Sequence, residues 1–260
     1  MPIILKTGGP IPIPSGYHET VVTPKASRAV EAYWSFTART AGRSVVLPDG
    51  RCDIMLRDNI HRRGAPVAIV TGPATRAYTV TYDIGDRWQG VRLRPANGVA
   101  LWKDQITQAS DRVLRSQDAH ALVPALAALG CNDITPDDLA GALPQLQWQG
   151  AAQIDLAIDT LHASGGRIRI AALARFIGCT PRHLNRMFRS TIGLTPKTYA
   201  QLVQFHRALR LIKNPRQSIT GSAFEGGYAD HAHLTRAFRR YGGFAPSCVP
   251  HDLTLPTLFA

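Results

Sequence analysis

The sequence predicts an α+β protein in which an antiparallel β-rich part precedes an all-helical part. Before about residue 104, apolar and polar residues alternate in several short runs, which is typical of half-buried strands. From about residue 119, Ala- and Leu-rich stretches follow the periodicity of helices. A chain of 260 residues, 45% of them hydrophobic, is long and apolar enough to form two cores.

Turn-forming sequences divide the β-rich part into short strands. The clearest alternating runs are residues 52–57, 78–82 and 91–94. Sequences such as Pro48-Asp49-Gly50 and Gly72-Pro73 separate the runs. Short strands at this spacing predict an antiparallel β barrel or sandwich of cupin-like form, and we expect a helical hairpin at about Arg28–Phe36.

The second half of the chain is predicted to be helical throughout. The expected helices are Ala121–Leu129, Asp137–Leu143, Ala151–His162, Ile170–Ile177, Arg182–Thr191, Lys197–Lys213, Ile219–Glu225 and His231–Tyr241. We therefore divide the chain into a β-rich domain (1–118), a helical connector (119–150), an all-helical domain (151–250) and a tail (251–260).

The formal net charge of +12 is unevenly distributed along the chain. Residues 150–260 carry 14 basic and 5 acidic side chains, a net of +9, whereas residues 1–149 have a net of +3. Such a basic segment favours a polyanionic partner, either a nucleic acid or an anionic membrane surface. No apolar run approaches the roughly 18–20 residues that span a bilayer, and the start lacks a signal-peptide pattern, so we expect a cytoplasmic protein.

The helix predicted around residues 181–192 has two distinct faces when it is projected at about 100° per residue. Its apolar arc holds Leu184, Met187, Phe188 and Thr191, and its polar arc holds Arg182, Asn185, Arg186 and Arg189. Asn can pair bidentately with adenine and Arg with guanine at the edges of bases. An apolar back and an Arg/Asn front are therefore what a DNA recognition helix requires.

The same pattern returns 50 residues later in the chain. Leu234, Arg236, Phe238 and Arg239 repeat Leu184, Arg186, Phe188 and Arg189. Each copy begins at an N-cap residue, Thr180 or Asp230, and follows a shorter helix and a turn at Gly178 or Gly227. Two helix-turn-helix motifs are thus predicted. The alternative is a helical bundle whose Arg residues form only a solvated face; the joint recurrence of caps, cores and Arg positions favours the two motifs.

These residues resemble the DNA-binding domain of the AraC/XylS family of transcriptional regulators, from about Ala151 to Val249. The resemblance rests on the segments 170–178, 180–189, 193–196, 207–211, 227–230, 234–238 and 243–246. In this family a long helix joins the two motifs, and Lys197–Lys213 fits that role at a length of about 25 Å. The family implies that both recognition helices enter successive segments of the major groove.

The resemblance also implies roles for the polar faces. The candidate base readers are Arg182, Asn185 and Arg186 in the first motif and His231, His233 and Arg236 in the second. The candidate phosphate contacts are Arg189, Arg239 and Arg240, and a phosphate contact is also the alternative role for Arg186 and Arg236. The second motif departs from the pattern, because Ser222 and Gly226 replace Leu173 and Ile177 and a short Ala232 lies at its front. We therefore expect the second motif to be softer and to contribute less to sequence discrimination.

The N-terminal domain resembles, less specifically, a sensor-like β-rich domain that precedes the DNA-binding part in a subgroup of AraC-type regulators. The matching features are a strand with Trp34, the segment 47–50 with Asp53 nearby, and the segments 72–76 and 90–95. Ala96-Asn97 stands where this subgroup has Pro-Gly. We interpret Asp49 as a turn residue rather than a ligand-binding group.

The chemistry of other protein classes is not supported by the sequence. A cupin-type metal-dependent enzyme fused to a helical domain, the alternative function, needs a His-x-His pair on its strands, whereas His231-Ala-His233 begins a helix. We expect no catalytic residue, metal or cofactor, and no membrane partner. The resemblance implies double-stranded DNA and RNA polymerase as partners, and it leaves open a small-molecule effector of the sensor domain and a homodimer.

Overall fold

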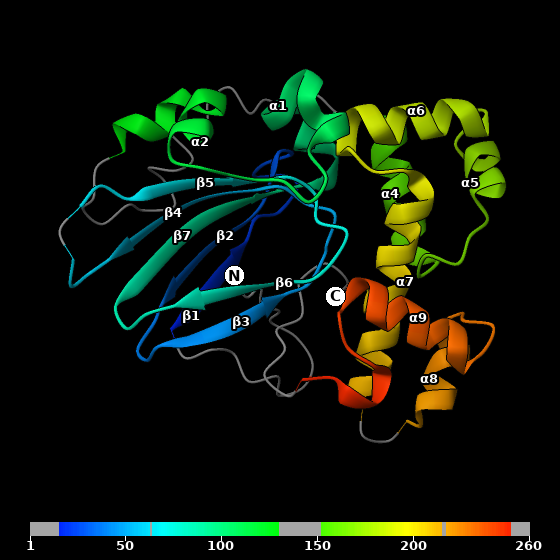
Figure 1. Cartoon of the computed structure of the whole chain (residues 1–260). Helices are drawn as coiled ribbons and strands as arrows, with labels where there is room; N and C mark the ends of the chain where they lie inside the picture. Colours follow the sequence, from blue (N-terminus) through cyan, green and yellow to red (C-terminus); the bar gives the residue numbers. More distant parts are fainter. Residues whose placement is uncertain (1–15, 63, 130–151, 215–216, 251–260) are drawn as a thin grey trace.

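The structure is a computed structural model that describes residues 16–62, 64–129, 152–214 and 217–250. A β-rich part and a helical part lie side by side, and the chain passes from the first to the second (Figure 1). The helix predicted at Asp137–Leu143 and the tail lie outside the described residues. No helix of the described ranges is both long and apolar enough to cross a bilayer.

The β-rich part is an antiparallel sandwich, so that of the two predicted forms the sandwich is observed. The large sheet has the order β1 (Tyr17–Val21), β2 (Val30–Thr37), β7 (Asp86–Leu93), β4 (Asp53–Asn59), β5 (Val67–Thr71) and β8 (Val113–Arg115). A second sheet pairs β3 (Gly42–Val46) with β6 (Tyr78–Tyr82). Aromatic side chains, among them Trp34, Phe36 and Trp88, fill the space between the two sheets.

Short helices cover the opposite face of the large sheet. They are η1 (Pro95–Asn97), α1 (Gly98–Trp102), η2 (Lys103–Gln108), α2 (Gln117–Leu122) and η3 (Pro124–Ala128). Trp102 is fully buried beneath them, and its indole Nε1 donates to the carbonyl of Thr71 at 3.2 Å. Ala119 and Leu126 belong to the same core, so the start of the predicted connector packs as part of the β-rich part.

The helical hairpin expected at Arg28–Phe36 is wrong, because this segment forms β2. Val30, Ala32, Trp34 and Phe36 are buried while the residues between them are partly exposed. This is the period-two pattern of a strand, and the segment is rich in β-branched and aromatic residues that favour sheets. β2 lies between β1 and β7 and is paired along its whole length.

The helices of the C-terminal part agree with the predicted ones to within one residue at each end. They are α4 (Ala152–Ala163), α5 (Ile170–Phe176), α6 (Pro181–Ile192), α7 (Pro196–Lys213), α8 (Ile219–Glu225) and α9 (His231–Tyr241). Both predicted N-caps are confirmed, since Thr180 Oγ1 accepts from His183 N at 3.2 Å and Asp230 Oδ1 accepts from His233 N at 2.6 Å.

The apolar residues missing from α8 are replaced by close packing against α7. A Cβ added at Gly226 would lie 2.8 Å from the carbonyl oxygen of Ser222 and 3.0 Å from the Cβ of Ala208. Ser222 is fully buried, and its hydroxyl donates to Gln217 Oε1 at 3.3 Å. Gly226 is therefore required by this contact, whereas an added Cβ at Gly221 meets only the exposed Ser218 hydroxyl at 3.2 Å.

We predict opposite effects for two glycine substitutions at these positions. Gly226→Ala should lower the free energy of unfolding by about 1–3 kcal/mol, because its methyl group overpacks the contact with α7. Gly221→Ala should cause no loss, since alanine favours a helix by about 0.5–1 kcal/mol over glycine. Urea unfolding of both variants measures this, and equal destabilisation by the two substitutions would contradict the packing argument.

Candidate nucleic-acid interface

Helix α6 presents the polar face that the sequence predicts. Leu184, Phe188 and Ile192 are buried in the helical core. Arg182, Arg186 and Arg189 are exposed, and Asn185 is partly exposed beside them. The four candidate contact residues of the first motif thus share one accessible face.

The structure adds His183 to this face. Its imidazole is exposed in the first turn of α6, and its Nδ1 lies 3.0 Å from Arg186 Nη2. His183 is not among the residues predicted from the polar arc, because it lies at the edge of that arc. At about 100° per residue, however, position 183 lies within about 60° of position 186. The contact orients the guanidinium of Arg186 along the first turn of the helix.

Helix α9 has a similar division into two faces. Leu234, Phe238 and Tyr241 are buried. The exposed basic candidates are His231, Arg236, Arg239 and Arg240. His233 differs from them, since its ring packs edge-on against buried Tyr228 with 5.1 Å between centroids. The second motif therefore offers fewer freely exposed polar groups in its first turn than the first motif does.

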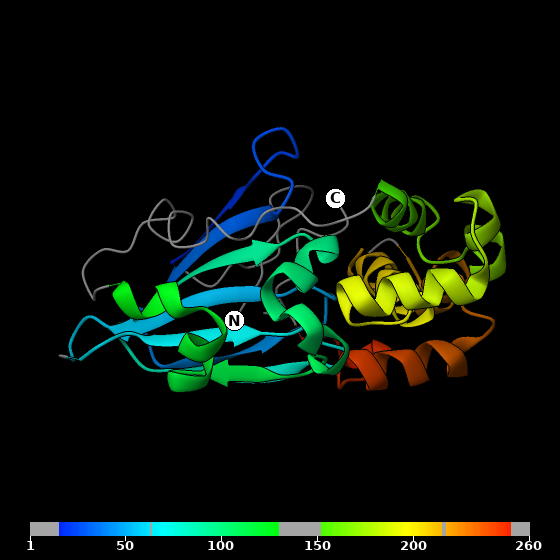
Figure 2. The ribbon, with the colours of Figure 1, turned by 90° about the horizontal axis from the view of Figure 1, so that it is seen from above.

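Helix α7 joins the two motifs and supplies their common core. Phe205, near its centre, contacts Phe238 of α9 with ring centroids 5.0 Å apart. Tyr199, near its start, contacts Phe188 of α6 with centroids 6.0 Å apart. With 18 residues, α7 is about 27 Å long. Helices α6 and α9 run in similar directions, as both overall views show (Figures 1 and 2).

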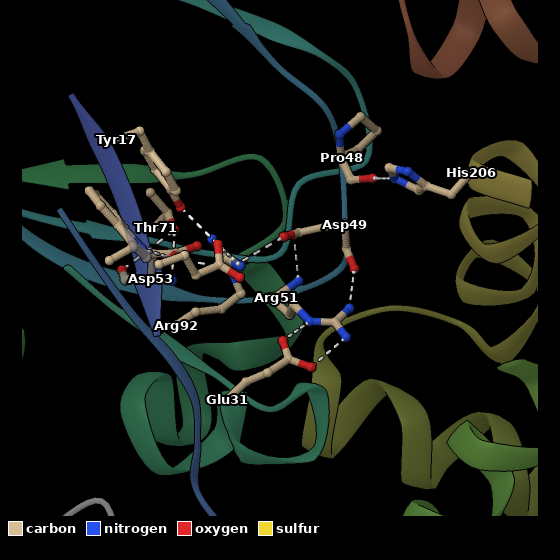
Figure 3. A network of polar contacts seen from close by, with 11 residues as sticks. Tyr17, Glu31, Pro48, Asp49, Arg51, Asp53, Thr71, Arg92 and His206 are labelled. Atoms are coloured by element: carbon tan, nitrogen blue, oxygen red, sulfur yellow. Dashed lines mark hydrogen bonds and ion pairs between the residues drawn. The ribbon is translucent and has the colours of Figure 1, made fainter. Parts of the chain in front are cut away.

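The β-rich part contacts all three of these helices directly. Ser110 Oγ donates to the carbonyl of Gly193, at the end of α6, at 3.2 Å. The backbone N–H of Ala77 donates to the carbonyl of Tyr241, at the end of α9, at 2.8 Å. His206 of α7 donates from Nε2 to the carbonyl of Pro48 at 2.7 Å (Figure 3). These contacts hold both recognition helices against one body.

Two protein-family models match the chain. A helix-turn-helix domain matches residues 173–249, and a domain of unknown function (DUF6597) matches residues 22–115. The uncharacterized HTH-type transcriptional regulator YidL of Escherichia coli (strain K12) is 37% identical over 98 residues, which are 37% of this chain and 33% of YidL. The HTH-type transcriptional activator RhaS of Escherichia fergusonii is 33% identical over 75 residues, 29% of this chain and 27% of RhaS.

Two solved structures also align with this chain, at lower sequence identity than these relatives. ToxT from Vibrio cholerae aligns with 90% of this chain and 97% of its own, at 9% identity and a TM-score of 0.41. A transcriptional regulator with an AraC-type DNA-binding domain from Chromobacterium violaceum aligns with 42% of this chain and 90% of its own, at 21% identity and a TM-score of 0.35.

The fold and the sequence matches together define the class of the C-terminal part: it is a double helix-turn-helix domain. More specifically, it is a domain of the AraC/XylS family, as the recurring motifs predict. It follows a separate β-rich part, as the family resemblance also predicts. In the described residues, no group of three His, Cys, Asp or Glu side chains is placed to hold a metal ion.

Burial lowers the pKa of His206 to about 3, with Arg210, Arg51 and His162 adding to the effect and the Pro48 carbonyl opposing it. Because the pKa in the folded state is below the ordinary 6.5, the unfolded chain binds the proton more readily between those values. The stability contributed by neutral His206 is therefore complete above about pH 6.5 and is lost as the pH falls toward 3.

We predict that the free energy of unfolding of the wild type falls by about 1 kcal/mol more than that of His206→Gln between pH 7.5 and 5.5. The glutamine amide can still donate to the Pro48 carbonyl but does not titrate. Urea unfolding at the two pH values measures the difference, with His61→Gln, on an exposed turn, as the control for loss of an imidazole. An equal pH dependence of wild type and His206→Gln would refute the assignment.

Proposed function

We propose that the chain is a sequence-specific DNA-binding transcriptional regulator. The observation that carries the proposal is the pair of helices α6 and α9, each with an apolar back and a basic front, joined by the single helix α7. Successive major-groove segments on one side of a duplex lie about 34 Å apart. Helix α7 sets the separation of the two recognition helices, with α6 packed near its start and α9 packed against its centre.

Within this proposal, the polar faces have two roles. The residues that read base edges are Arg182, Asn185, Arg186, His231, His233 and Arg236. The residues that hold phosphates are Arg189, Arg239 and Arg240. His183 contributes by orienting Arg186, since the two side chains are in contact. Base readers determine which sequence is bound, whereas phosphate contacts fix the register of the protein on the duplex.

The other expected properties follow from this function. Double-stranded DNA and RNA polymerase are the partners, the chain acts in the cytoplasm, and it catalyses no reaction. The matched relatives are named as transcriptional regulators or activators, which supports a role in transcription. The β-rich part receives the signal, and its contacts with α6, α7 and α9 give a direct route from that part to the DNA-binding helices. A homodimer fits the same function.

Arg186→Ala should weaken binding to a duplex selected from random sequences by about 1–3 kcal/mol, because a bidentate Arg–guanine pair contributes that much discrimination. Titration by fluorescence anisotropy at fixed salt measures the loss. Arg62→Ala removes one positive charge from an exposed surface pair of the β-rich part and is the matched control. Unchanged affinity and unchanged preference over random duplex in Arg186→Ala would refute the role.

The two motifs should differ in how much sequence they read. We predict that Arg236→Ala, or an altered second half-site, reduces specific binding less than Arg186→Ala or an altered first half-site. The front of α9 carries Ala232, which can touch at most a thymine methyl group, and His233 is packed against Tyr228. The same titrations compare them, and an equal or larger loss from the second half-site contradicts the prediction.

A further inference from the structure

A cavity of about 210 Å³ lies at the end of the sandwich that faces the helices. Three segments supply its walls: residues 46–53, 71–78 and 111–113. Its volume is below that of sites for drug-sized ligands, so it suits a molecule of a few heavy atoms. The charged groups of its walls indicate what the cavity binds. The contacts that the same three segments make with the helices indicate what binding does.

Two carboxylates of the cavity wall share one guanidinium. Asp49 and Asp53 are both buried, and they lie 3.8 Å and 3.5 Å from Nε of Arg92 (Figure 3). Arg92 is 1% exposed and also faces Glu19, whose Oε2 is 3.4 Å from its Nη1. Three carboxylates thus surround a single positive charge in a region where water cannot screen them.

Asp49 retains capacity to bind a cation. Its Oδ1 accepts from the backbone N–H of Arg51 at 3.0 Å, as a turn residue does; a role of the other oxygen in ligand binding departs from the interpretation of Asp49 made from the sequence. Its Oδ2 is buried and accepts no hydrogen bond from any residue that the structure describes. Arg92 Nε faces this atom at 3.8 Å, too far for a hydrogen bond, so the ion pair leaves the oxygen without the hydrogen bond that a buried carboxylate normally accepts.

The other charges of the cavity wall are already engaged or exposed. Arg51 binds Glu31 through Nε and Nη2 and the carbonyl of Asp49 through Nη1. Asp111 accepts two hydrogen bonds from Thr75, at 2.7 and 2.6 Å. The side chain of Arg76 is 75% exposed and lies 3.9 Å from Asp111. The buried side of the cavity therefore favours a cation over an anion.

The pKa values of the two carboxyl groups agree with this balance of charge. Burial raises the pKa of Asp53 to about 6, with Arg92 opposing the shift and Asp49 adding to it. Burial likewise raises the pKa of Asp49, against the effect of Arg51 and Arg92. A second positive charge beside them would favour their ionised forms.

Each wall of the cavity also contacts a DNA-binding helix through an adjacent residue. Asp49 follows Pro48, whose carbonyl accepts from His206 of α7. Arg76 precedes Ala77, which donates to the last residue of α9. The third wall begins next to Ser110, which donates to the carbonyl of Gly193, the residue that follows α6. A molecule that bridges the three walls would thus act on the three segments that hold α6, α7 and α9.

We propose that this cavity binds a small molecule with a protonated amine, held by Asp49 and Asp53, and that its binding tightens the contacts of the β-rich part with α6, α7 and α9. The ammonium group donates to Asp49 Oδ2 and offsets the repulsion between the two carboxylates. The regulatory meaning of this site rests on the proposed DNA-binding function, whereas the binding itself does not.

The first experiment measures binding to the full chain without DNA. n-Butylamine, 1-butanol and butyrate are titrated as probes of similar size, by isothermal calorimetry and by the midpoint of thermal unfolding. Saturable binding of the amine alone is expected, at least tenfold weaker in Asp49→Asn and unchanged in Asp83→Asn, an exposed control. Equal binding of butyrate or butanol, no saturable amine binding, or full binding by Asp49→Asn would overturn the proposal.

Asp53→Asn provides a second test in case Asp49→Asn does not fold. It keeps the acceptor for Trp34 Nε1, which donates to Asp53 Oδ1 at 3.0 Å, but removes one charge. The amine should bind this variant at least threefold more weakly. Binding as tight as that of the wild type by a folded Asp53→Asn protein counts against the site.

The second experiment measures the coupling between the cavity and the helices. Saturating n-butylamine should slow hydrogen exchange of the Ala77 amide, which donates to Tyr241, at least threefold in the wild type and not in Asp49→Asn. Unchanged exchange with the amine bound would refute the coupling. DNA affinity without amine is measured separately, so failure of the DNA-binding function is distinguished from failure of this site.

Discussion

The position of α7 is the constraint on which the rest of the structure depends. Tyr199 is buried near its start, where its hydroxyl lies 2.9 Å from His162 Nε2 of α4 and its ring packs on Phe188 of α6. The same ring lies against Gly50 of the β-rich part, where an added Cβ would be 3.1 Å away. One side chain therefore ties the first motif, the long helix and the sandwich together. Any rotation of α7 would have to break all these contacts at once.

The polar network beneath α7 makes this arrangement specific rather than simply stable. Buried ion pairs such as Arg51 with Glu31 cost desolvation free energy that their attraction only partly offsets. Their geometry is nevertheless demanding, because each guanidinium N–H needs an acceptor in a fixed direction. The carbonyls of Pro48 and Asp49 lie on the segment that this network orients, and the first of them accepts the hydrogen bond from His206. The network thus fixes where α7 docks.

The sequence predicted the helical part well because its signals are local. N-caps such as Thr180 and Asp230, and apolar residues at helical spacing, act within one or two turns. For the segment of β2 the sequence led to two conflicting predictions, a helical hairpin at Arg28–Phe36 and, from the family resemblance, a strand with Trp34; its period-two alternation agrees with the strand. The network around Arg92 and the contact of His206 with Pro48 join positions far apart in the chain, 158 residues apart in the latter case. No periodicity or spacing rule contains such pairs.

The second motif also shows that the effect of a departure from a family pattern depends on how the substituted residues pack. By composition, Ser222 and Gly226 weaken the first helix of the second motif. In the structure, Gly226 lets α8 approach Ala208 of α7, and the side chain of Ser222 is buried with its hydroxyl hydrogen-bonded. A larger side chain at position 226 would therefore have no room beside α7. The remaining asymmetry lies at the surface, in the short side chain of Ala232 and the packed ring of His233, where base reading is decided.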